Sequence, residues 1–353
     1  MVSSTLAIPS PEQVHLFDRA RDGFDGAIVL HSTALGPAAG GCRLWQYADR
    51  SAMIQDACRL AEGMTYKNAL AGLPLGGGKA VLQLPADPAD RAALFTAFGR
   101  AVRALDGCYV TAEDVGTSVA DMSIVARETH HVAGLPLRAG AVGGDPSPWT
   151  ARGVLLAMQH AVRRRLGRDL ADCTVAIQGV GHVGAALANL LHKAGAKLII
   201  ADLNSAAAAR VAVALGAEIA TADSILWRKA DVFAPCALGG VLNRRTIGKL
   251  TATVVCGAAN NQLGGPDDAA RLADRDILYA PDFAVNAGGI INVAAEYFAW
   301  PVAAATELMD RIPATLHHVL EIAARQGLSN HAAAESLAQQ MILAGSVDRR
   351  SAA

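Results

Sequence analysis

The spacing of apolar residues predicts alternating strands and helices along the first part of the chain. Residues 26–31 and 80–84 are mostly apolar, as buried strands are, whereas residues 51–64 and 90–105 carry apolar side chains at three- and four-residue intervals, as helices do. Between residues 138 and 148 the composition changes to Ala, Gly, Asp, Pro and Ser, which favour turns. We therefore expect a domain boundary in this segment.

The same alternation continues in the second part of the chain. Residues 174–178 and 197–201 have the pattern of buried strands, and short apolar runs recur at 232–234, 253–256 and 277–280. Helical spacing occurs at residues 149–166, 183–194, 205–215, 304–326 and 331–344. Strands that alternate with helices argue for a parallel sheet covered on both faces.

These patterns predict an α/β protein of two domains with a cleft between them. We expect residues 1–140 to form an N-terminal α/β domain that binds substrate and carries the catalytic groups. Residues 141–325 are expected to form a C-terminal Rossmann domain, a doubly wound parallel sheet. Residues 326–353 are helical in pattern, and we expect them to pack back on the first domain.

Composition narrows the range of functions. Apolar residues make up 52% and charged residues 18% of the 353 residues, and the formal net charge is −1 with positive residues scattered. The apolar content favours a large buried core. The scattered positive residues predict no basic patch that would bind nucleic acid or an anionic membrane. The six cysteines lack metal-ligand spacing, and no run of about 18 strongly apolar residues occurs. We therefore expect a cytoplasmic protein with free thiols, no metal, and no membrane or nucleic-acid partner.

A glycine pattern directly follows the strand predicted at residues 174–178. Gly179, Gly181 and Gly184 have the spacing of the fingerprint that joins a strand to the first helix of a dinucleotide-binding unit. The first glycine permits a tight turn, the second lets the backbone approach a pyrophosphate, and the third allows the helix to pack closely on the strand. The free amides at the helix N-terminus then face the phosphates. The pattern predicts dinucleotide binding.

Asp202 indicates which dinucleotide is bound. It stands at the end of the next strand, about 20 residues after the glycines, where a carboxylate accepts hydrogen bonds from the ribose hydroxyls. The same carboxylate repels a 2′-phosphate, so NAD is expected rather than NADP. The alternative is that Asp202 caps the following helix, a role that Asn204 or Ser205 can equally fill.

Three polar residues stand out in the first domain. Lys67 comes at the end of a predicted helix, Lys79 follows three glycines just before a strand, and Asp114 follows the strand predicted at residues 109–111. Consecutive glycines cost backbone entropy, and they indicate a sharp turn or the close approach of a ligand rather than packing. The alternatives are a solvated surface charge for each lysine and a helix cap for Asp114.

Together these motifs resemble a known family. Their order across residues 35–295 is similar to that of the leucine, valine and phenylalanine branch of the amino-acid dehydrogenases, which are relatives of glutamate dehydrogenase. The matching segments are residues 36–43, 63–67, 76–79, 111–116, 146–150, 179–184, 234–239, 257–263 and 281–289. The resemblance implies an NAD-dependent enzyme that oxidatively deaminates an apolar L-amino acid to the 2-oxo acid, releases ammonium and NADH, and catalyses the reverse reductive amination.

The resemblance also implies roles for individual residues. Lys67 is expected to bind the substrate carboxylate, Lys79 to activate water, and Asp114 to shuttle protons to the amine. Hydride leaves the substrate α-carbon for the nicotinamide, and water attacks the iminium ion that results. A neutral lysine can take a proton from that water, provided that burial and a neighbouring cation lower its pKa.

The remaining predicted site residues form two groups. Besides Lys67, the resemblance implies that substrate contacts Ala39, Gly40, Gly41, Ala112, Asn261, Ile290 and Val293. It implies that the cofactor contacts Thr150, Gly179, Gly181, His182, Val183, Gly184, Asp202, Leu203, Cys236, Ala237, Ala258, Asn260 and Asn286. Trp149 departs from the family pattern, in which valine or alanine often stands beside the threonine, and its bulk is expected to affect the hinge or the cleft.

The substrate is predicted from the absence of charge in this pocket. Glutamate dehydrogenases typically carry a lysine at the position of Ala39, which pairs with the side-chain carboxylate. Without that cation glutamate would bury an unpaired carboxylate, so glutamate is disfavoured. Ala39, Ile290 and Val293 predict a substrate of the leucine, valine or isoleucine type. Phenylalanine is the alternative, because Ala39 leaves extra room.

Two interpretations from other classes are weaker. A non-catalytic regulatory protein that binds NAD has no need of Lys67, Lys79 and Asp114 together. A dehydrogenase of 2-hydroxy acids commonly uses a histidine as its acid–base group, and none of the ten histidines lies in a comparable motif. We therefore expect an enzyme whose partners are a small amino-acid substrate and further copies of itself, the homo-oligomer being implied by the resemblance alone.

Overall fold

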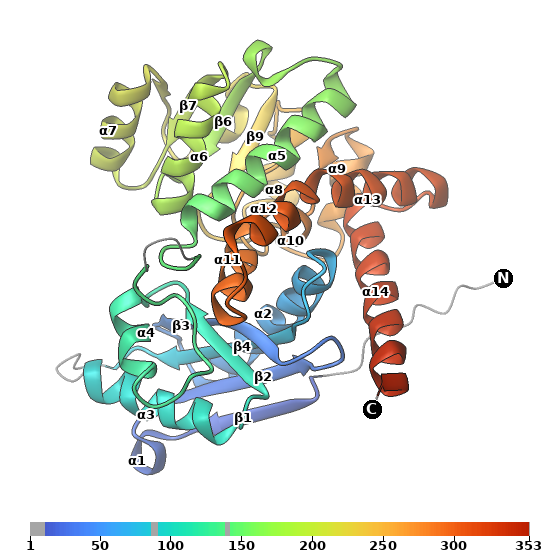
Figure 1. The fold of residues 1–353 in the computed structure, drawn as a ribbon. Coiled ribbons are helices and arrows are strands. Elements are labelled where there is room, and N and C mark those ends of the chain that lie inside the picture. The colour runs from blue at the N-terminus through green and yellow to red at the C-terminus, as the bar shows by residue number, and fades with distance from the viewer. Residues whose placement is uncertain (1–10, 86–90, 138–141, 353) are drawn as a thin grey trace. The chain divides into compact units, whose positions relative to one another are not determined.

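The computed structural model describes residues 11–85, 91–137 and 142–352, and their contacts divide the chain into two compact units (Figure 1). The first unit consists of Met1–Pro146, Ile290–Ala305 and Ala338–Ala353, and the second of Ser147–Gly289 and Thr306–Leu337. The division expected from the sequence differs in three places: it set the boundary after residue 140, left residues 290–305 with the second unit, and assigned residues 326–337 to the first. Residue 90, the predicted start of a helix, and residues 138–141 of the turn segment lie outside the described residues.

A mixed five-stranded sheet forms the centre of the first unit. Across the sheet the strands are β1 (Gln13–Phe17), β2 (Gly26–Ser32), β4 (Gly76–Gln83), β3 (Ala38–Trp45) and β5 (Tyr109–Glu113). β3 pairs in parallel with β4 and β5, whereas β2 pairs antiparallel with β1 and β4. Helix α2 (Arg50–Leu70) covers one face, and helices α3 (Arg91–Ala104) and α4 (Val119–Val125) cover the other; α1 (Arg19–Asp22) is a short helix after β1 (Figure 1).

Both faces of the sheet are buried at its inner strands, such as β2 and β4, which explains why these strands are mostly apolar, whereas the edge strand β1 is largely exposed. In β2, Ala27 and Val29 pack toward α2, whereas Ile28 and Leu30 belong to the core with α3 and α4. Successive residues of a strand point to opposite faces, so a strand covered on both sides contributes to two cores. The sequence of such a strand is a run of apolar residues without polar alternation.

The three glycines before Lys79 are part of β4 and do not form a turn. None of residues 76–78 has the positive φ that a tight glycine turn would show. A Cβ at Gly77 would lie 2.0 Å from Oγ1 of Thr65 and 2.2 Å from its backbone nitrogen, both on α2. The predicted sharp turn is therefore wrong, and so is the expectation that packing plays no part, because Gly77 allows α2 to lie directly on β4. The close approach of a ligand, the other expectation for this run, stays a prediction.

The second unit contains a six-stranded parallel sheet with the order β11-β10-β9-β6-β7-β8. Its strands are β6 (Thr174–Gln178), β7 (Lys197–Ala201), β8 (Glu218–Ile219), β9 (Val232–Pro235), β10 (Val254–Val255) and β11 (Leu278–Tyr279). Numbered within the unit and read from β8, the order is 3-2-1-4-5-6, that of the doubly wound dinucleotide-binding fold. The order reverses between β6 and β9, and ligands bind such sheets beyond the carboxyl ends of the strands at this switch point.

Most helices of the chain's second half belong to this unit. They are α5 (Ser147–Leu166), α6 (His182–Lys193), α7 (Ser205–Leu215), α8 (Arg244–Ile247), α9 (Asp268–Asp274), α10 (Asp282–Val285) and α13 (Ile312–Gln326), with 3₁₀ turns at Leu170–Asp172 and Ile225–Trp227. Three helices contain residues of both units: α11 (Gly288–Tyr297), α12 (Val302–Asp310) and α14 (Asn330–Ala352). Residues 304–326 were predicted as one helix but form two, because Pro313 stands in the first turn of α13 and cannot continue a helix interior.

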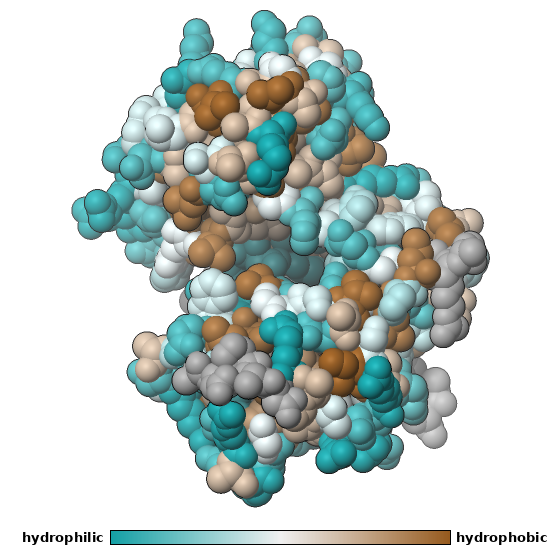
Figure 2. Space-filling model, turned by 90° about the vertical axis from the view of Figure 1, so that its left-hand side faces the viewer, coloured by the Kyte–Doolittle hydropathy of each residue, from teal (hydrophilic) through white to brown (hydrophobic). Residues whose placement is uncertain are grey.

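The surface is chemically mixed on the face that Figure 2 presents, where hydrophobic residues lie in small separate groups among hydrophilic ones. Among the described residues, no helix is long and apolar enough to cross a membrane. The same part of the chain contains no group of three or more His, Cys, Asp and Glu side chains that could hold a metal ion. The six cysteines are all unpaired thiols.

Candidate active site

Several predicted substrate residues of the first unit lie on one face of its sheet. Ala39 is paired with Gly77 of β4, and Gly41 is paired with Ala112 of β5. Paired residues point to the same face, and so do residues two apart in one strand. Because the Cβ position of Gly77 points at α2, these residues and Lys79 all lie on the face that α2 covers.

Lys79 and Asp114 form a buried ion pair beyond the end of β5. The side chain of Lys79 is 6% exposed and that of Asp114 is 15% exposed, and Lys79 Nζ donates a hydrogen bond to Asp114 Oδ2. Neither alternative considered from the sequence applies. Lys79 is not a surface charge, and Ser118 rather than Asp114 caps the next helix. The fold thus brings together the two residues that were predicted to be catalytic.

A second cation, Arg43, approaches Asp114 from β3. Arg43 Nε lies 3.6 Å from Asp114 Oδ2, and Arg43 Nη1 donates to Asp56 Oδ2 on α2 at 3.1 Å. Tyr47 Oη donates to the same oxygen of Asp56 at 2.7 Å. Burial opposes the charged form of Asp114, but the charges of Lys79 and Arg43 outweigh burial and hold the pKa of this carboxyl well below its usual range. Asp114 is therefore an ionised carboxylate at neutral pH.

Lys67 lies in the last turn of α2 beside a buried amide, Asn68. Their exposed fractions are 8% and 0%. Asn68 Nδ2 donates to the carbonyl oxygen of Gly76 on β4 at 2.5 Å and lies 3.5 Å from that of Ala39 on β3. Asn68 thereby ties the end of α2, and with it Lys67, to the two strands. No role was predicted for Asn68 or Arg43, whose only signal in the sequence is a position in or beside a motif.

The other residues of the first unit that were predicted to contact substrate lie in β3 and α11, and of these Gly41 is only partly buried. The carbonyl oxygen of Gly40 accepts a hydrogen bond from Tyr109 Oη at 2.5 Å. A Cβ at Gly41 would lie 2.6 Å from a backbone oxygen of β5, so the close approach of β3 and β5 requires glycine here. Ile290 and Val293 are 7% and 6% exposed and belong to the same unit as β3.

The glycine fingerprint forms the turn between β6 and α6, at the switch point of the second sheet. Gly179 has a φ of +94°, which favours glycine, and a Cβ at Gly184 would lie 2.0 Å from the carbonyl oxygen of Gly179. Gly181 faces open space and precedes α6 without a side-chain cap, and His182 and Val183 occupy the first turn. The turn, the open approach and the exposed amides fit the pyrophosphate of a dinucleotide.

Two backbone hydrogen bonds hold Asp202 beside the glycine loop. Asp202 Oδ2 accepts from the backbone nitrogen of Val180 at 2.7 Å, and Oδ1 accepts from that of Asn204 at 2.8 Å. Asn204 caps α7, since its Oδ1 accepts from the backbone nitrogen of Ala207 at 3.0 Å. The alternative that Asp202 caps this helix is therefore wrong. The next residue, Leu203, is 91% exposed.

Amide side chains gather after β10 and at the end of α10. Asn286 Nδ2 donates to Asn260 Oδ1 at 2.9 Å and to the carbonyl oxygen of Ala258 at 3.1 Å. Asn286 Oδ1 is buried and accepts no hydrogen bond from the described residues. Leaving such an acceptor without a partner costs about 1–3 kcal/mol, so this oxygen fits a donor on a ligand, such as a carboxamide. Asn261 has a φ of +51°, and its backbone nitrogen donates to Asp282 Oδ2 at 2.8 Å.

The remaining cofactor candidates also lie in the second unit. Thr150 and Trp149 are half-buried in the first turn of α5, and a Cβ at Gly288 would lie 2.1 Å from the carbonyl oxygen of Trp149. The backbone of Trp149 thus packs closely against the start of α11. Cys236 and Ala237 follow β9 beside the glycine loop, and burial raises the pKa of the Cys236 thiol to about 12. All the predicted cofactor residues therefore belong to one unit.

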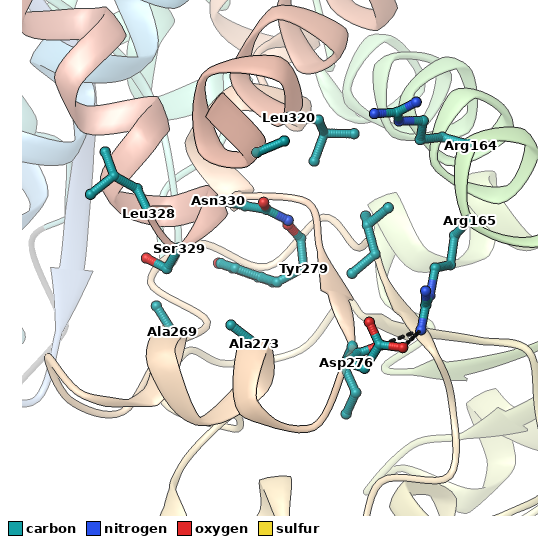
Figure 3. A pocket seen from close by; sticks show the side chains of 13 residues that line it. Arg164, Arg165, Ala269, Ala273, Asp276, Tyr279, Leu320, Leu328, Ser329 and Asn330 are labelled. Carbon is teal, nitrogen blue, oxygen red and sulfur yellow. Dashed lines mark hydrogen bonds and ion pairs between the residues drawn. The ribbon is translucent and has the colours of Figure 1, made fainter. Parts of the chain in front are cut away.

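A hollow of about 400 Å³ in the second unit lies between α5, α9, β11, α13 and the start of α14 (Figure 3). Its polar side chains bind protein groups. Arg165 pairs with Asp276, Arg164 Nη2 lies 2.9 Å from Glu321 Oε1, and Asn330 Nδ2 donates to a backbone oxygen of β11 at 2.9 Å. None of the predicted site residues lines this hollow. We assign no ligand to it.

Comparison with known proteins gives matches over both units. The family model described as Glu/Leu/Phe/Val dehydrogenase, dimerisation domain, matches residues 11–131. The model described as Glutamate/Leucine/Phenylalanine/Valine dehydrogenase matches residues 145–209 and 201–348. The first match includes Lys79 and Asp114, and the second includes the glycine loop.

Individual relatives are similar over nearly their whole length. The leucine dehydrogenase of Geobacillus stearothermophilus is 43% identical over 94% of this chain and 90% of its own. The valine dehydrogenase of Streptomyces albus is 44% identical over 93% of this chain and 91% of its own. The crystal structure of L-tryptophan dehydrogenase from Nostoc punctiforme has a TM-score of 0.79 and 37% identity, and the match covers 95% of this chain and 97% of that one.

Proposed function

Because the chain belongs to the Glu/Leu/Phe/Val dehydrogenase family, we propose that it oxidatively deaminates an aliphatic L-amino acid with NAD and catalyses the reverse reductive amination. It is an oxidoreductase that acts on small amino acids, and dehydrogenases of this family depend on NAD or NADP. The observation that carries the proposal is the buried pair of Lys79 and Asp114, a lysine and an ionised carboxylate in contact.

Residues of the first unit fit the acid–base steps of this reaction. When bound, NAD supplies the hydride acceptor for the substrate α-carbon. Asp114 stabilises the cationic iminium group that forms on the substrate, because opposite charges attract strongly at a buried site. Lys79 pairs with Asp114 as an ammonium ion, so it must first release one proton to solvent. The neutral amine of Lys79 then accepts a proton from the water that attacks the iminium carbon. Asp114, in contact with Lys79, takes this proton from Lys79 and delivers it to the leaving amine, which links the two transfers.

The second unit fits the cofactor. Gly179, Gly181 and Gly184 would cradle the pyrophosphate, and Asn286 Oδ1 offers an acceptor to the nicotinamide carboxamide. For Asp202 we propose contact with the ribose hydroxyls, and with it a preference for NAD over NADP, because its carboxylate beside the loop repels a 2′-phosphate. The preference is measured as kcat/KM with NAD divided by kcat/KM with NADP. Asp202→Ser should lower this ratio by about ten-fold or more. An unchanged ratio would contradict this role.

The proposed substrate side chain is aliphatic. Ala39, Ala112, Ile290 and Val293 are apolar and almost fully buried, and they offer no cation to a side-chain carboxylate. An aromatic amino acid is the second candidate, because two alanines leave room and because a similar solved structure is a tryptophan dehydrogenase. Differences of one methylene in an apolar pocket discriminate by only about 1–3 kcal/mol, so we expect several amino acids to be accepted.

The environment and assembly of the enzyme are further parts of the proposal. We propose a homo-oligomer, because the matching family model for residues 11–131 is described as a dimerisation domain. Light scattering after gel filtration tests this, since a mass equal to one chain would contradict it. The unpaired thiols agree with a reducing compartment such as the cytoplasm, and that location stays a prediction.

The function is tested by initial rates of NADH formation with Leu, Val, Ile, Phe, Trp and Glu, each with NAD and with NADP. Aliphatic substrates should give the largest kcat/KM, and glutamate should give almost none. Dominance of Phe or Trp would favour the aromatic candidate instead. Lys79→Ala should still bind NAD in a fluorescence titration but lose turnover, and unchanged turnover would refute the catalytic assignment. Turnover of no amino acid by the wild type would leave a non-catalytic NAD-binding protein as the alternative.

A further inference from the structure

Helix α11 brings the proposed pocket residues Ile290 and Val293 to the first unit from a distant part of the sequence. Residues 290–305 belong to this unit, although the chain reaches them only after 143 residues of the second unit, Ser147–Gly289. The pocket wall therefore depends on how this separate segment is fixed to the rest of the unit. No residue predicted from the sequence performs that task.

Glu296, in the last turn of α11, makes the strongest connection. Its Oε2 accepts a hydrogen bond from the backbone nitrogen of Gly134 at 2.7 Å, and its Oε1 accepts from that of Leu135 at 2.9 Å. A carboxylate that accepts from two successive backbone amides makes charge-assisted bonds, which are about twice as strong as neutral ones. Two bonds to one carboxylate also fix the direction of the side chain.

Two further contacts of α11 are made to the same part of the unit. The buried Asn292 Oδ1 accepts from the backbone nitrogen of Gly143 at 3.1 Å. Tyr297 Oη lies 2.9 Å from His131 Nδ1, within hydrogen-bond distance. We call Asn292, Glu296 and Tyr297 together the α11 anchor. It ties the helix to residues 131–135 and to Gly143.

The backbone at Gly143 is adapted to this approach. Its φ is +136°, a region that favours glycine, and a Cβ there would lie 2.9 Å from the carboxyl carbon of Glu296. A side chain at this position would push the carboxylate away from its two amide donors. The contact therefore depends on glycine on one side and on a carboxylate on the other.

The position of the anchor on the helix determines what it controls. Each residue of an α-helix is rotated by about 100° from the previous one, so Glu296 lies about 60° around the helix from Val293 and about 120° from Ile290. A rotation of α11 by about 20° moves its Cα atoms by roughly 0.8 Å, since they lie on a cylinder of about 2.3 Å radius. Such a rotation would carry both pocket residues with it.

We propose that Glu296 is a positioning residue that sets the orientation of α11 and, through Ile290 and Val293, the selectivity of the enzyme among apolar amino acids. The inference rests on the proposed function, because it assumes that these two side chains contact the substrate. Glu296 itself touches neither substrate nor cofactor in this proposal. Glu296 affects which substrate side chain fits the pocket. In an apolar pocket, one methylene group of the substrate changes kcat/KM by about 10- to 200-fold.

Glu296→Gln is the test variant, because it keeps the size of the side chain. It replaces one acceptor oxygen by an NH2 group, which cannot accept a hydrogen bond from a backbone N–H. The measurement is the ratio of kcat/KM for leucine to that for phenylalanine, taken on one enzyme preparation. This ratio does not depend on the fraction of folded enzyme, so a purely structural role would not move it. We expect the ratio to change by about three-fold or more, with the KM for NAD changed by less than about two-fold.

Glu307→Gln is the matched control. Glu307 lies on α12, its side chain is 69% exposed, and it forms a surface ion pair with Arg311. The ratio of kcat/KM for leucine to that for phenylalanine in this variant should therefore equal that of the wild type. Tyr297→Phe is the milder second variant if Glu296→Gln does not fold, since it removes one hydroxyl of the anchor. It should shift the ratio by a smaller amount.

The outcomes separate this inference from the proposed function. A shifted ratio in Glu296→Gln, or in Tyr297→Phe when the first variant does not fold, supports the anchor. An active wild type whose ratio is unchanged in the folded test variant overturns the anchor alone. A wild type without turnover of any amino acid overturns the proposed function, and the anchor with it.

Discussion

Gly77→Ala tests whether the glycine run of β4 sets the distance between the sheet and α2. The added Cβ would lie 2.0 Å from Thr65 Oγ1, 2.2 Å from its backbone nitrogen and 2.4 Å from its Cα. The hydroxyl can rotate away, but the backbone atoms of a helix cannot. Because carbon atoms pack at about 3.5–4.0 Å, α2 must move away from β4 by roughly 1 Å.

The shift has a cost in stability and a cost in activity. Overpacking of this kind destabilises by about 1–3 kcal/mol, and for a unit of about 150–250 residues this corresponds to a fall in Tm of about 2–12 °C. Lys67 is carried by α2, whereas Lys79 is carried by β4, so the movement separates the proposed carboxylate-binding group from the catalytic pair. Misplacement by about 1 Å can reduce kcat/KM by about 100-fold.

The assay combines thermal unfolding with kcat/KM for the preferred amino acid. Gly248→Ala is the control, because that glycine has an ordinary φ of −58° and its Cβ would meet only one atom, at 4.0 Å. The control should retain the Tm and kcat/KM of the wild type. If Gly77→Ala also retained both, α2 would not be held against β4 by this glycine, and the packing argument would be refuted.

Two further predictions concern single side chains. Asn204→Ala removes the cap of α7 and should lower the free energy of unfolding by about 0.5–2 kcal/mol in urea titrations while kcat stays unchanged; an unchanged free energy would contradict the capping role. Burial opposes the charged form of Asp121, but hydrogen bonds from Arg91 and Ser118 outweigh it and lower its pKa from the ordinary 3.8. The ionised carboxylate therefore stabilises the fold above about pH 4, and this stabilisation is lost as the pH falls through the pKa of the folded state. The free energy of unfolding of the wild type should exceed that of Asp121→Asn at pH 7, and the difference should disappear below pH 4. Equal advantages at both pH values, measured by urea unfolding, would show that ionisation of Asp121 contributes nothing.

The second unit was predicted closely because its strands and helices have strong local patterns. The strands at residues 174–178 and 197–201 and the helix at 205–215 have the predicted bounds, and the fingerprint stands where the spacing places it. A parallel strand that is buried on both faces is a short apolar run between polar helix ends, so local sequence is sufficient. Pro313 was a readable signal for the break before α13 that the helical spacing concealed.

The first unit was predicted less well because its structure depends on long-range packing. α2 continues to Leu70, beyond the predicted end at residue 64, and Gly77 is explained only by the helix that lies on it. The contact of Lys79 with Asp114 could be expected only from the resemblance. The assignment of residues 290–305 to this unit has no local signal, since it follows from contacts such as those of Glu296.

The discontinuous first unit has a consequence for biosynthesis. On the ribosome, residues 1–146 emerge well before residues 290–305 and 338–353, which belong to the same unit. The early part of the chain must therefore wait, with part of its interior uncovered, while most of the second unit is made. Exposed apolar surface and unpaired strand edges promote aggregation at this stage, and contacts between distant segments form slowly. We therefore expect the chain to need chaperones during synthesis because of the order of its segments along the gene. This need does not depend on the stability of the individual elements in the finished enzyme.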